Sequence, residues 1–364
     1  MLGDALGVAR VDGVRGAPGD LVVVEGEARG GALVDAAIVT RHASRHADLG
    51  DVRRFVFDGI GRALVARQSA LDAVRAYFAD ERFLEVTTPV RVPSPGLDPH
   101  LEGVEASGAY LVTSPEVQMK RLLVGGVPRC FQIGPCFRAD ERGRLHHPEF
   151  TMVEWYRAWA GWQDVLTDTE RLVQRVAVAV SGQPRLRAGE RELDATPPFE
   201  RVRVRDAFAE HAGVDADALV ELAAHDHDAY FRLMVDVIEP SLAASTRPVF
   251  LVDFPASHAS LARRCPDDPR FAERFELYAA GVELCNGFGE LTDAAEQRAR
   301  FADDLRVRRA RGLAEPPVDE RFLRALDEGM PPSAGNALGL DRLLMLAVGA
   351  RSISDVVAFD PDSL

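Results

Sequence analysis

Lysine is almost missing from this sequence. Of its 43 basic residues only one, Lys120, is a lysine, and the other 42 are arginines. A phosphate-binding loop of the form G-x-x-x-x-G-K-[ST] is therefore excluded, because Lys120 lies in QMKRL with no glycine before it. Pyridoxal-phosphate chemistry would also have to depend on that one residue. Any phosphate that this protein binds is expected to be held by arginine.

Cysteine and long apolar runs are scarce as well. The four cysteines form no C-x-x-C pair and no regular framework, which favours reduced thiols in a cytoplasmic protein. No apolar run approaches the ~20 residues of a membrane span. The opening MLGDALGVARVDG has no basic region followed by an apolar one. We therefore expect neither a membrane segment nor a signal peptide.

The sequence also has no excess of positive charge. Its net charge of −14 gives no overall attraction to a phosphate backbone. This argues weakly against a dedicated nucleic-acid binder, since a local basic patch can lie within an acidic total.

The remaining composition, 47% hydrophobic and 27% charged, is that of a globular protein. Residues 1–52 predict a short β-rich extension, because VARVDGV and DLVVVEGEA are separated by turn residues. It is either a β-hairpin or an incomplete OB-like module. Residues 53–364 predict an α+β domain, an antiparallel sheet with interspersed helices, since no regular βαβ alternation occurs.

A polar loop between two apolar strands marks the first candidate site. The stretch CFRADERGRLHHPEFTMVEWY, residues 136–156, predicts a β-hairpin that carries Arg138 on one strand and Glu154 and Tyr156 on one face of the other. A buried guanidinium needs an anion, and its planar fork suits phosphate. Phe150 offers a flat face to a base or to Arg342. The alternative is an arginine–carboxylate network that only closes the hairpin.

Three glutamates spaced by seven residues form the second candidate. In RFELYAAGVELCNGFGEL, an Ala280-Gly281 turn would let Glu276 and Glu283 face each other, and Glu290 follows. Paired carboxylates among apolar residues repel unless a cation lies between them, and Mg²⁺ shared with phosphates meets that need. The alternative is two surface glutamates.

The third candidate is GNALGLDRLLML, whose small residues allow a ligand to approach closely. Arg342 falls at the start of an apolar helix, where backbone N–H groups favour anions. The alternative is a helix capped by Asp341 with an incidental arginine.

Taken together, these stretches resemble motifs 2 and 3 of the class II aminoacyl-tRNA synthetases. RFLEVTTP is similar to motif 1 of that class, which builds a dimer interface around a proline, here Pro89. PEVQMKRL, HHPEFTMVEWY and NGFGEL are similar to the lysyl branch. Residues 60–364 most resemble truncated members of that branch that attach β-lysine to elongation factor P.

The resemblance implies a role for each matching residue. Arg138 and Arg342 would be catalytic and would hold the α- and γ-phosphates of ATP. Asp140, His146 and Phe150 would complete the ATP site, and Glu276 and Glu283 would bind Mg²⁺. The residues that would line the lysine pocket are Glu116, Glu154, Tyr156, Cys285, Asn286 and Glu290. Several carboxylates around one cavity suit a ligand with two ammonium groups.

Two positions depart from the family pattern. Asp140 stands where the family has glutamate, and Cys285 is bulkier than the glycine or alanine of the relatives. We predict that this bulk disfavours an α-amino group and favours a β-amino acid. Lys120 receives no role here: either arginine does not fit its place, or chance kept the lysine.

The implied function is ATP-dependent activation of lysine or β-lysine as an acyl-adenylate, followed by transfer to a lysine side chain of elongation factor P. The implied assembly is a homodimer. The alternatives are a lysyl-tRNA synthetase, a small-molecule aminoacyl ligase and a catalytically inactive regulatory paralogue. We do not expect tRNA as the acceptor, because about 50 N-terminal residues are too few for a complete anticodon-binding OB domain. An inactive paralogue would have lost Arg138, Arg342, Glu276 or Glu283, and all four are present.

Overall fold

The structure is a computed structural model that describes residues 2–3, 8–17, 19–43, 50–99, 101–139 and 141–364. Asp140 lies outside the described residues, so its predicted place in the ATP site stays a prediction. Within these ranges no helix has both the length and the apolar character that crossing a bilayer requires.

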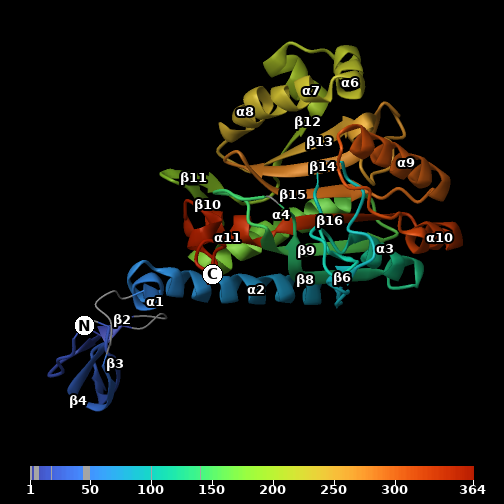
Figure 1. Ribbon diagram of the computed structural model, residues 1–364. Helices are drawn as coiled ribbons and strands as arrows, with labels where there is room; N and C mark the ends of the chain where they lie inside the picture. The colour runs from blue at the N-terminus through green and yellow to red at the C-terminus, as the bar shows by residue number, and fades with distance from the viewer. Residues whose placement is uncertain (1, 4–7, 18, 44–49, 100, 140) are drawn as a thin grey trace. The chain divides into compact units, whose positions relative to one another are not determined.

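An eight-stranded sheet forms the centre of the larger part of the chain (Figure 1). Its strands run in the order β12-β13-β14-β15-β16-β9-β8-β5, and neighbours are antiparallel except for the parallel pairs β12–β13 and β5–β8 at the two edges. This confirms the predicted antiparallel α+β fold. The strands are β5 (Leu84–Glu85), β8 (Arg129–Phe137), β9 (Glu149–Ala158), β12 (Glu200–Arg203), β13 (Val249–Pro255), β14 (Phe271–Ala279), β15 (Val282–Gly289) and β16 (Ser333–Gly339).

The helices pack on this sheet and around its ends. Figure 1 shows α6, α7 and α8 gathered beside β12 and β13, and α9 next to α10. These helices are α2 (Ile60–Asp80), α3 (Glu116–Val124), α4 (Trp162–Ser181), α5 (Val204–Ala207), α6 (Ala216–His225), α7 (His227–Leu233), α8 (Glu239–Ala243), α9 (Ala294–Ala310), α10 (Glu320–Gly329) and α11 (Leu340–Val348). The short helix α1 (Gly50–Val52) belongs to the N-terminal unit. Two small hairpins complete this part, β6 (Arg91–Val92) with β7 (Tyr110–Leu111) and β10 (Arg185–Ala188) with β11 (Arg191–Asp194).

The two faces of the central sheet differ, because successive side chains of a strand alternate between faces. The back face carries Trp155 and Asn336 and is covered by helices. The ring of Trp155 lies 5.4 Å from that of Phe78 in α2, and Asn336 Nδ2 donates to Thr169 Oγ1 in α4 at 2.8 Å. The front face carries Glu154 and its row neighbours, so Glu154 and Tyr156 of β9 face away from this helical layer, whereas Arg157 faces it and pairs with Asp168 of α4.

The N-terminal residues form a separate four-stranded sheet in the order β1-β2-β4-β3. Its strands are β1 (Leu2–Gly3), β2 (Val8–Val11), β3 (Leu21–Arg29) and β4 (Ala32–His42). By its contacts the chain divides into two compact units, residues 1–69 with 354–364, and residues 70–353. The boundary predicted after residue 52 falls inside the first unit and stays a prediction.

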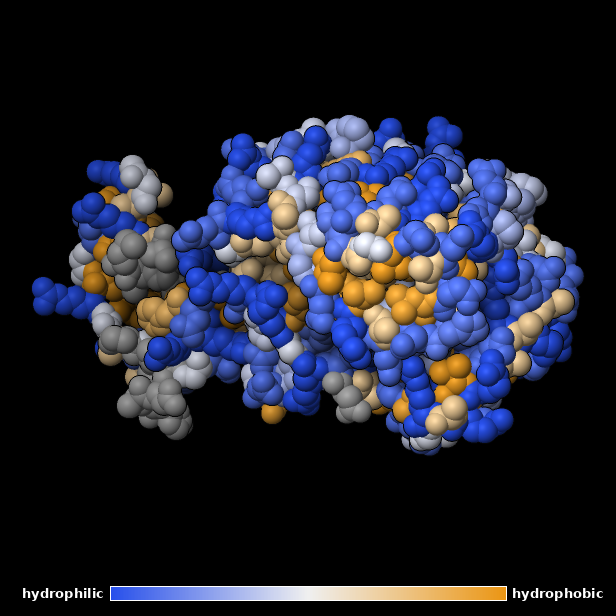
Figure 2. Space-filling model, turned by 90° about the horizontal axis from the view of Figure 1, so that it is seen from above, coloured by the Kyte–Doolittle hydropathy of each residue, from blue (hydrophilic) through white to orange (hydrophobic). Residues whose placement is uncertain are grey.

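The surface is mainly hydrophilic on the side seen in Figure 2, where an apolar patch is surrounded by polar residues. Apolar area of this kind is ordinary on folded proteins.

Candidate functional site

The register of four neighbouring strands places the predicted polar residues in one row. Glu154 of β9 pairs with Ala337 of β16, Ala337 pairs with Asn286 of β15, and Asn286 pairs with Glu276 of β14. Directly paired residues project from the same side of a sheet. Glu154, Asn286 and Glu276 therefore share the front face, and Tyr156 lies on it two residues beyond Glu154.

A carboxylate pocket lies at one end of this row. Ser114 Oγ and Tyr156 Oη each donate to the Glu154 carboxylate at 2.6 Å. Glu116, the first residue of α3, and Glu290, just after β15, meet at the ammonium group of Lys120. The structure thus brings together Glu116, Glu154, Tyr156 and Glu290, which the family resemblance assigns to one pocket.

Burial controls the charge of this pocket. Burial, reinforced by the nearby charge of Glu116, raises the pKa of Glu154 to about 7. Burial also raises the pKa of Glu290, although the neighbouring Lys120 opposes it. Buried carboxylates of this kind stay ionised only when cations balance them. The pocket therefore favours a ligand that brings positive charge.

Cys285 lies on the other side of the sheet, and its predicted place in the pocket is wrong. It pairs with Leu277 and Leu338, while its chain neighbour Asn286 pairs with the front-face residues Glu276 and Ala337. The Cys285 thiol is buried against Asn336 on the back face. The small residue that does lie between Glu154 and Asn286 is Ala337.

This correction predicts which substitution alters amino-acid preference. Cys285→Ala is expected to leave the ratio of lysine to β-lysine activation unchanged, because the sulfur does not reach the front face. Ala337→Gly removes one methyl group between Glu154 and Asn286 and is expected to change that ratio. Pyrophosphate exchange with both amino acids measures it. A ratio that moves in Cys285→Ala and stays fixed in Ala337→Gly would reverse our assignment of faces.

The first predicted phosphate ligand lies at the far end of the β8–β9 hairpin. Arg138 follows β8, and its guanidinium carbon lies 5.1 Å from the centre of the Phe150 ring. Phe150 pairs with Cys136 and so shares the front face with Glu154, four residues along β9. In this structure the Phe150 ring thus lies against the guanidinium of Arg138. One nitrogen of that guanidinium lies 3.7 Å from a carboxylate oxygen of Glu141.

The second predicted phosphate ligand, Arg342, joins this hairpin to β15. Its Nη2 donates to His146 Nε2 at 2.6 Å, its Nε to the Leu145 carbonyl at 3.1 Å and its Nη1 to the Glu283 carbonyl at 2.8 Å. The pKa of His146 is lowered, first by burial and then by Arg342. With the imidazole neutral, the positive charge of this pair lies on the Arg342 guanidinium, which can bind an anion.

The predicted metal ligands share a face but are not directly opposite each other. Asn286 stands opposite Glu276, and Glu283 stands opposite Tyr278, because the ladder shifts between Leu277 and Tyr278. Glu276 accepts from Arg274 at 2.6 Å and from Tyr278 at 2.7 Å, and the Glu283 carboxylate lies 3.6 Å from Arg342.

Within the described ranges no group of three or more His, Cys, Asp and Glu side chains is arranged to hold a metal. Two front-face carboxylates next to a predicted phosphate ligand still fit Mg²⁺, which takes one or two carboxylates and shares the rest of its shell with phosphates and water.

Several buried polar atoms on this face have no hydrogen-bond partner among the described residues, and two of them lie where the resemblance places ATP and the amino acid. Of these two, Arg138 Nε is a donor and Asn286 Oδ1 is an acceptor. Buried polar groups are nearly always paired in folded proteins. An orphan donor at the arginine end and an orphan acceptor beside the carboxylates match a ligand with an anionic group and an amino group.

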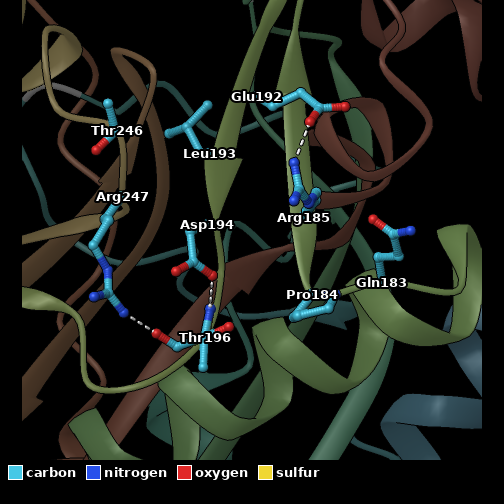
Figure 3. Close-up of a pocket in the computed structure, with 9 residues that line it drawn as sticks. All are labelled: Gln183, Pro184, Arg185, Glu192, Leu193, Asp194, Thr196, Thr246 and Arg247. Atoms are coloured by element: carbon cyan, nitrogen blue, oxygen red, sulfur yellow. Dashed lines mark hydrogen bonds and ion pairs between the residues drawn. The ribbon is translucent and has the colours of Figure 1, made fainter.

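One hollow of the structure lies away from these residues. It has a volume of about 510 Å³ and is lined by the β10–β11 hairpin with Thr246 and Arg247 (Figure 3). Its charged groups already have partners: Arg185 bonds Glu192, and Arg247 bonds the Thr196 carbonyl. Since none of the predicted site residues lines it, this hollow does not carry the function.

Sequence reasoning missed several residues of the site. Lys120 is 1% exposed and holds two pocket carboxylates, and Ser114 and Arg274 bind Glu154 and Glu276. For Lys120 a signal existed, because it is the chain's single lysine. Ser114 and Arg274 had no comparable signal, since serine and arginine recur throughout the sequence.

This fold and this front-face site define a class II synthetase domain. The profile of the family "tRNA synthetases class II (D, K and N)" matches residues 44–363, and the chain belongs to this family.

The curated relatives narrow the comparison. The chain is 42% identical over 321 residues to the elongation factor P–(R)-beta-lysine ligase of Edwardsiella ictaluri, covering 82% of this chain and 95% of the relative. It is 42% identical over 309 residues to the protein of the same name from Proteus mirabilis, covering 81% and 94%. The ligase of that name from Klebsiella pneumoniae is 40% identical over 316 residues, covering 82% and 95%.

Proposed function

We propose that this protein activates lysine or β-lysine with ATP and transfers it to a lysine side chain of elongation factor P. The names of the curated relatives support the reaction and the acceptor. The observation that carries the proposal is the carboxylate pocket, where Glu116, Glu154 and Glu290 lie around one buried ammonium group. A pocket with this excess of negative charge suits a diamino acid.

The first half-reaction joins the amino acid to AMP. A carboxylate oxygen of the amino acid attacks the α-phosphorus of ATP, the bond to pyrophosphate breaks, and an acyl-adenylate forms. Arg138 would bind the α-phosphate and Arg342 the γ-phosphate, and Phe150 would lie against the adenine. Glu276 and Glu283 would hold Mg²⁺, which neutralises phosphate charge when bound. Positioning and charge neutralisation supply the rate, and no covalent bond to the protein is needed.

The second half-reaction makes an amide. The neutral amine of the acceptor lysine attacks the acyl carbon, AMP leaves with the bonding electron pair, and the amine releases a proton to solvent.

We also propose that the enzyme acts in the cytoplasm as a homodimer, because an elongation factor works there and RFLEVTTP is similar to the dimer motif of the family.

The decisive experiment incubates the protein with ATP, β-lysine and elongation factor P and then measures the mass of the factor. We expect the factor to gain the mass of one β-lysyl group, and no gain when ATP is left out. A parallel reaction replaces the factor with lysine-accepting tRNA. Charging of the tRNA with no change in the factor would favour the lysyl-tRNA synthetase alternative.

The pocket also predicts a pH dependence. Because the pKa of Glu154 is raised to about 7, its carboxylate is ionised above that pH and protonated below it. An ammonium group binds the ionised form, so the KM for the diamino acid should rise by roughly tenfold for each pH unit below about 6.5. The KM for ATP should change little. Exchange assays between pH 5.5 and 8.5 measure both, and Glu154→Gln should remove the step. A KM for the amino acid that stays level through this range would contradict the proposed role of Glu154.

A further inference from the structure

Among the residues that the structure describes, Lys120 is the one cation inside the carboxylate pocket, and nothing in the proposed reaction yet uses it. Its side chain is 1% exposed and reaches from the middle of α3 to Glu116 at 2.5 Å, one helical turn earlier. It also pairs with Glu290, whose side chain is fully buried. Its nitrogen lies 6.0 Å from the centre of the Tyr156 ring and 5.8 Å from that of Phe288.

The shape of the pocket gives a physical reason why position 120 is a lysine and not an arginine. Elsewhere this chain uses arginine even for buried cations, such as Arg308, which is 1% exposed, and Arg274. A guanidinium is a flat fork, whereas an ammonium group is a compact point charge with three donors. Between two carboxylates and two aromatic rings, the compact group serves both acids at once. Of the two explanations left open by the sequence, this geometry favours the one in which arginine does not fit.

Lys120 also stays charged in this surrounding. Burial by itself would lower its pKa, but the carboxylates of Glu116 and Glu290 outweigh burial and raise it. The ionisable groups that face the pair are those already named: Glu116 from α3, Glu154 and Tyr156 from β9, and Glu290 after β15. Lys120 is therefore a fixed internal cation at neutral pH.

We propose that Lys120 is a positioning residue that sets the charge of the substrate pocket: it holds Glu116 and Glu290 in place and cancels one of three negative charges, so that the two remaining charges match a substrate with two ammonium groups. This inference rests on the proposed function. When all three carboxylates are ionised, they and the one ammonium leave a net charge of minus two, which the two ammonium groups of a diamino acid cancel. A substrate with a single amino group leaves one buried carboxylate unbalanced, and that carboxylate has to take up a proton.

The test begins with Lys120→Met, which keeps most of the apolar stem and removes the charge. The proposal expects the KM for lysine or β-lysine to rise roughly tenfold or more, with kcat reduced less than about threefold. It also expects the acid limb of kcat/KM to move up by about one pH unit, because the carboxylates lose their cation. Arg121→Met is the matched control, since Arg121 is the exposed neighbour of Lys120 on α3. Its KM and pH profile should match those of the unaltered protein.

A second variant separates charge from packing and is available even if the first folds poorly. Lys120→Met combined with Glu116→Gln removes one charge of each sign, so the pocket keeps the net charge that the two ammonium groups of the substrate balance. We expect its acid limb to return to within about 0.3 pH units of that of the unaltered protein, and its thermal midpoint to exceed that of Lys120→Met. If Lys120 only fills space, the effects of the two substitutions should add, and the acid limb should not return toward that of the unaltered protein. That result would overturn the inference.

The two proposals fail in different ways. If the unaltered protein shows no exchange with any diamino acid, the proposed function is wrong. If it shows exchange and Lys120→Met keeps the same KM and the same acid limb, only the role of Lys120 is wrong.

Discussion

Arg342→Ala is expected to lower ATP–pyrophosphate exchange by roughly 10²- to 10³-fold, the loss typical when one preorganised donor to a developing charge is removed. The substitution also releases the hairpin loop, because Arg342 bonds Leu145, His146 and Glu283 from one side chain. Arg342→Lys should recover little, because the three contacts come from three nitrogens spread over a planar guanidinium, and lysine has a single nitrogen at one point. The loss should fall on the exchange reaction, with the fold and the subunit assembly unchanged.

The control for this prediction is Arg298→Ala, which removes an exposed arginine that pairs with Glu320 on the surface. Exposed pairs contribute little to stability, so exchange and thermal midpoint should both stay near those of the unaltered protein. Size-exclusion chromatography and circular dichroism report on assembly and fold of each variant. Exchange that survives Arg342→Ala in a folded protein would remove Arg342 from the phosphate site.

Gly335→Ala is expected to disrupt the carboxylate pocket, because Gly335 lies on the strand next to Tyr156. Gly335 of β16 pairs with Tyr156, and an added Cβ would overlap the Tyr156 ring and come within 3.0 Å of the Glu290 carboxylate. Tyr156 is 3% exposed and bonded to Glu154, so it has no free space to move into. We expect a loss of about 1–3 kcal/mol in unfolding free energy, the usual result of overpacking. The KM for the diamino acid should rise by roughly tenfold or more, because the ring and both acids shift.

Gly125→Ala serves as the matched control. Gly125 ends α3 with φ of −69°, and an added Cβ would meet only ordinary contacts at 3.4 and 3.5 Å. Chemical denaturation and exchange kinetics of both variants decide the matter. If Gly335→Ala is as stable and as active as Gly125→Ala, the close approach of β16 to Tyr156 does not matter for binding.

Much of the fold could be predicted from local patterns. The two-residue turn at Ala280-Gly281 has positive φ at both positions, 53° and 78°, and joins β14 to β15 as the sequence indicated. The hairpin of residues 136–156 is formed by β8 and β9, and its alternation puts Glu154 and Tyr156 on one face. These predictions hold because strand pleat and turn geometry act over a few residues.

Cys285 shows where such reasoning fails. Assigning it to the pocket required knowing which residue of an apolar run faces the ligand, and a shift of one position reverses every face. The ladder between β14 and β15 is irregular between Leu277 and Tyr278, and no local pattern shows where that irregularity falls. Glu276 and Glu283 are affected by the same shift, since they share a face without standing opposite each other.

The amino-acid sequence by itself determined the strands, the helices, the acidic and arginine-rich motifs and the family to which they point. These depend on side-chain periodicity and on short-range steric effects, both of which act between residues that are close together in the sequence. Only the tertiary structure decided that Lys120 meets Glu116 and Glu290, that Arg342 joins residue 146 to residue 283, and that Cys285 is turned away. Those outcomes depend on the packing of α3 against β9 and on the register of β14, β15, β16 and β9. Segments as far apart in the chain as β9 and β16, or Lys120 and Glu290, are brought together there by shared burial rather than by neighbouring residues.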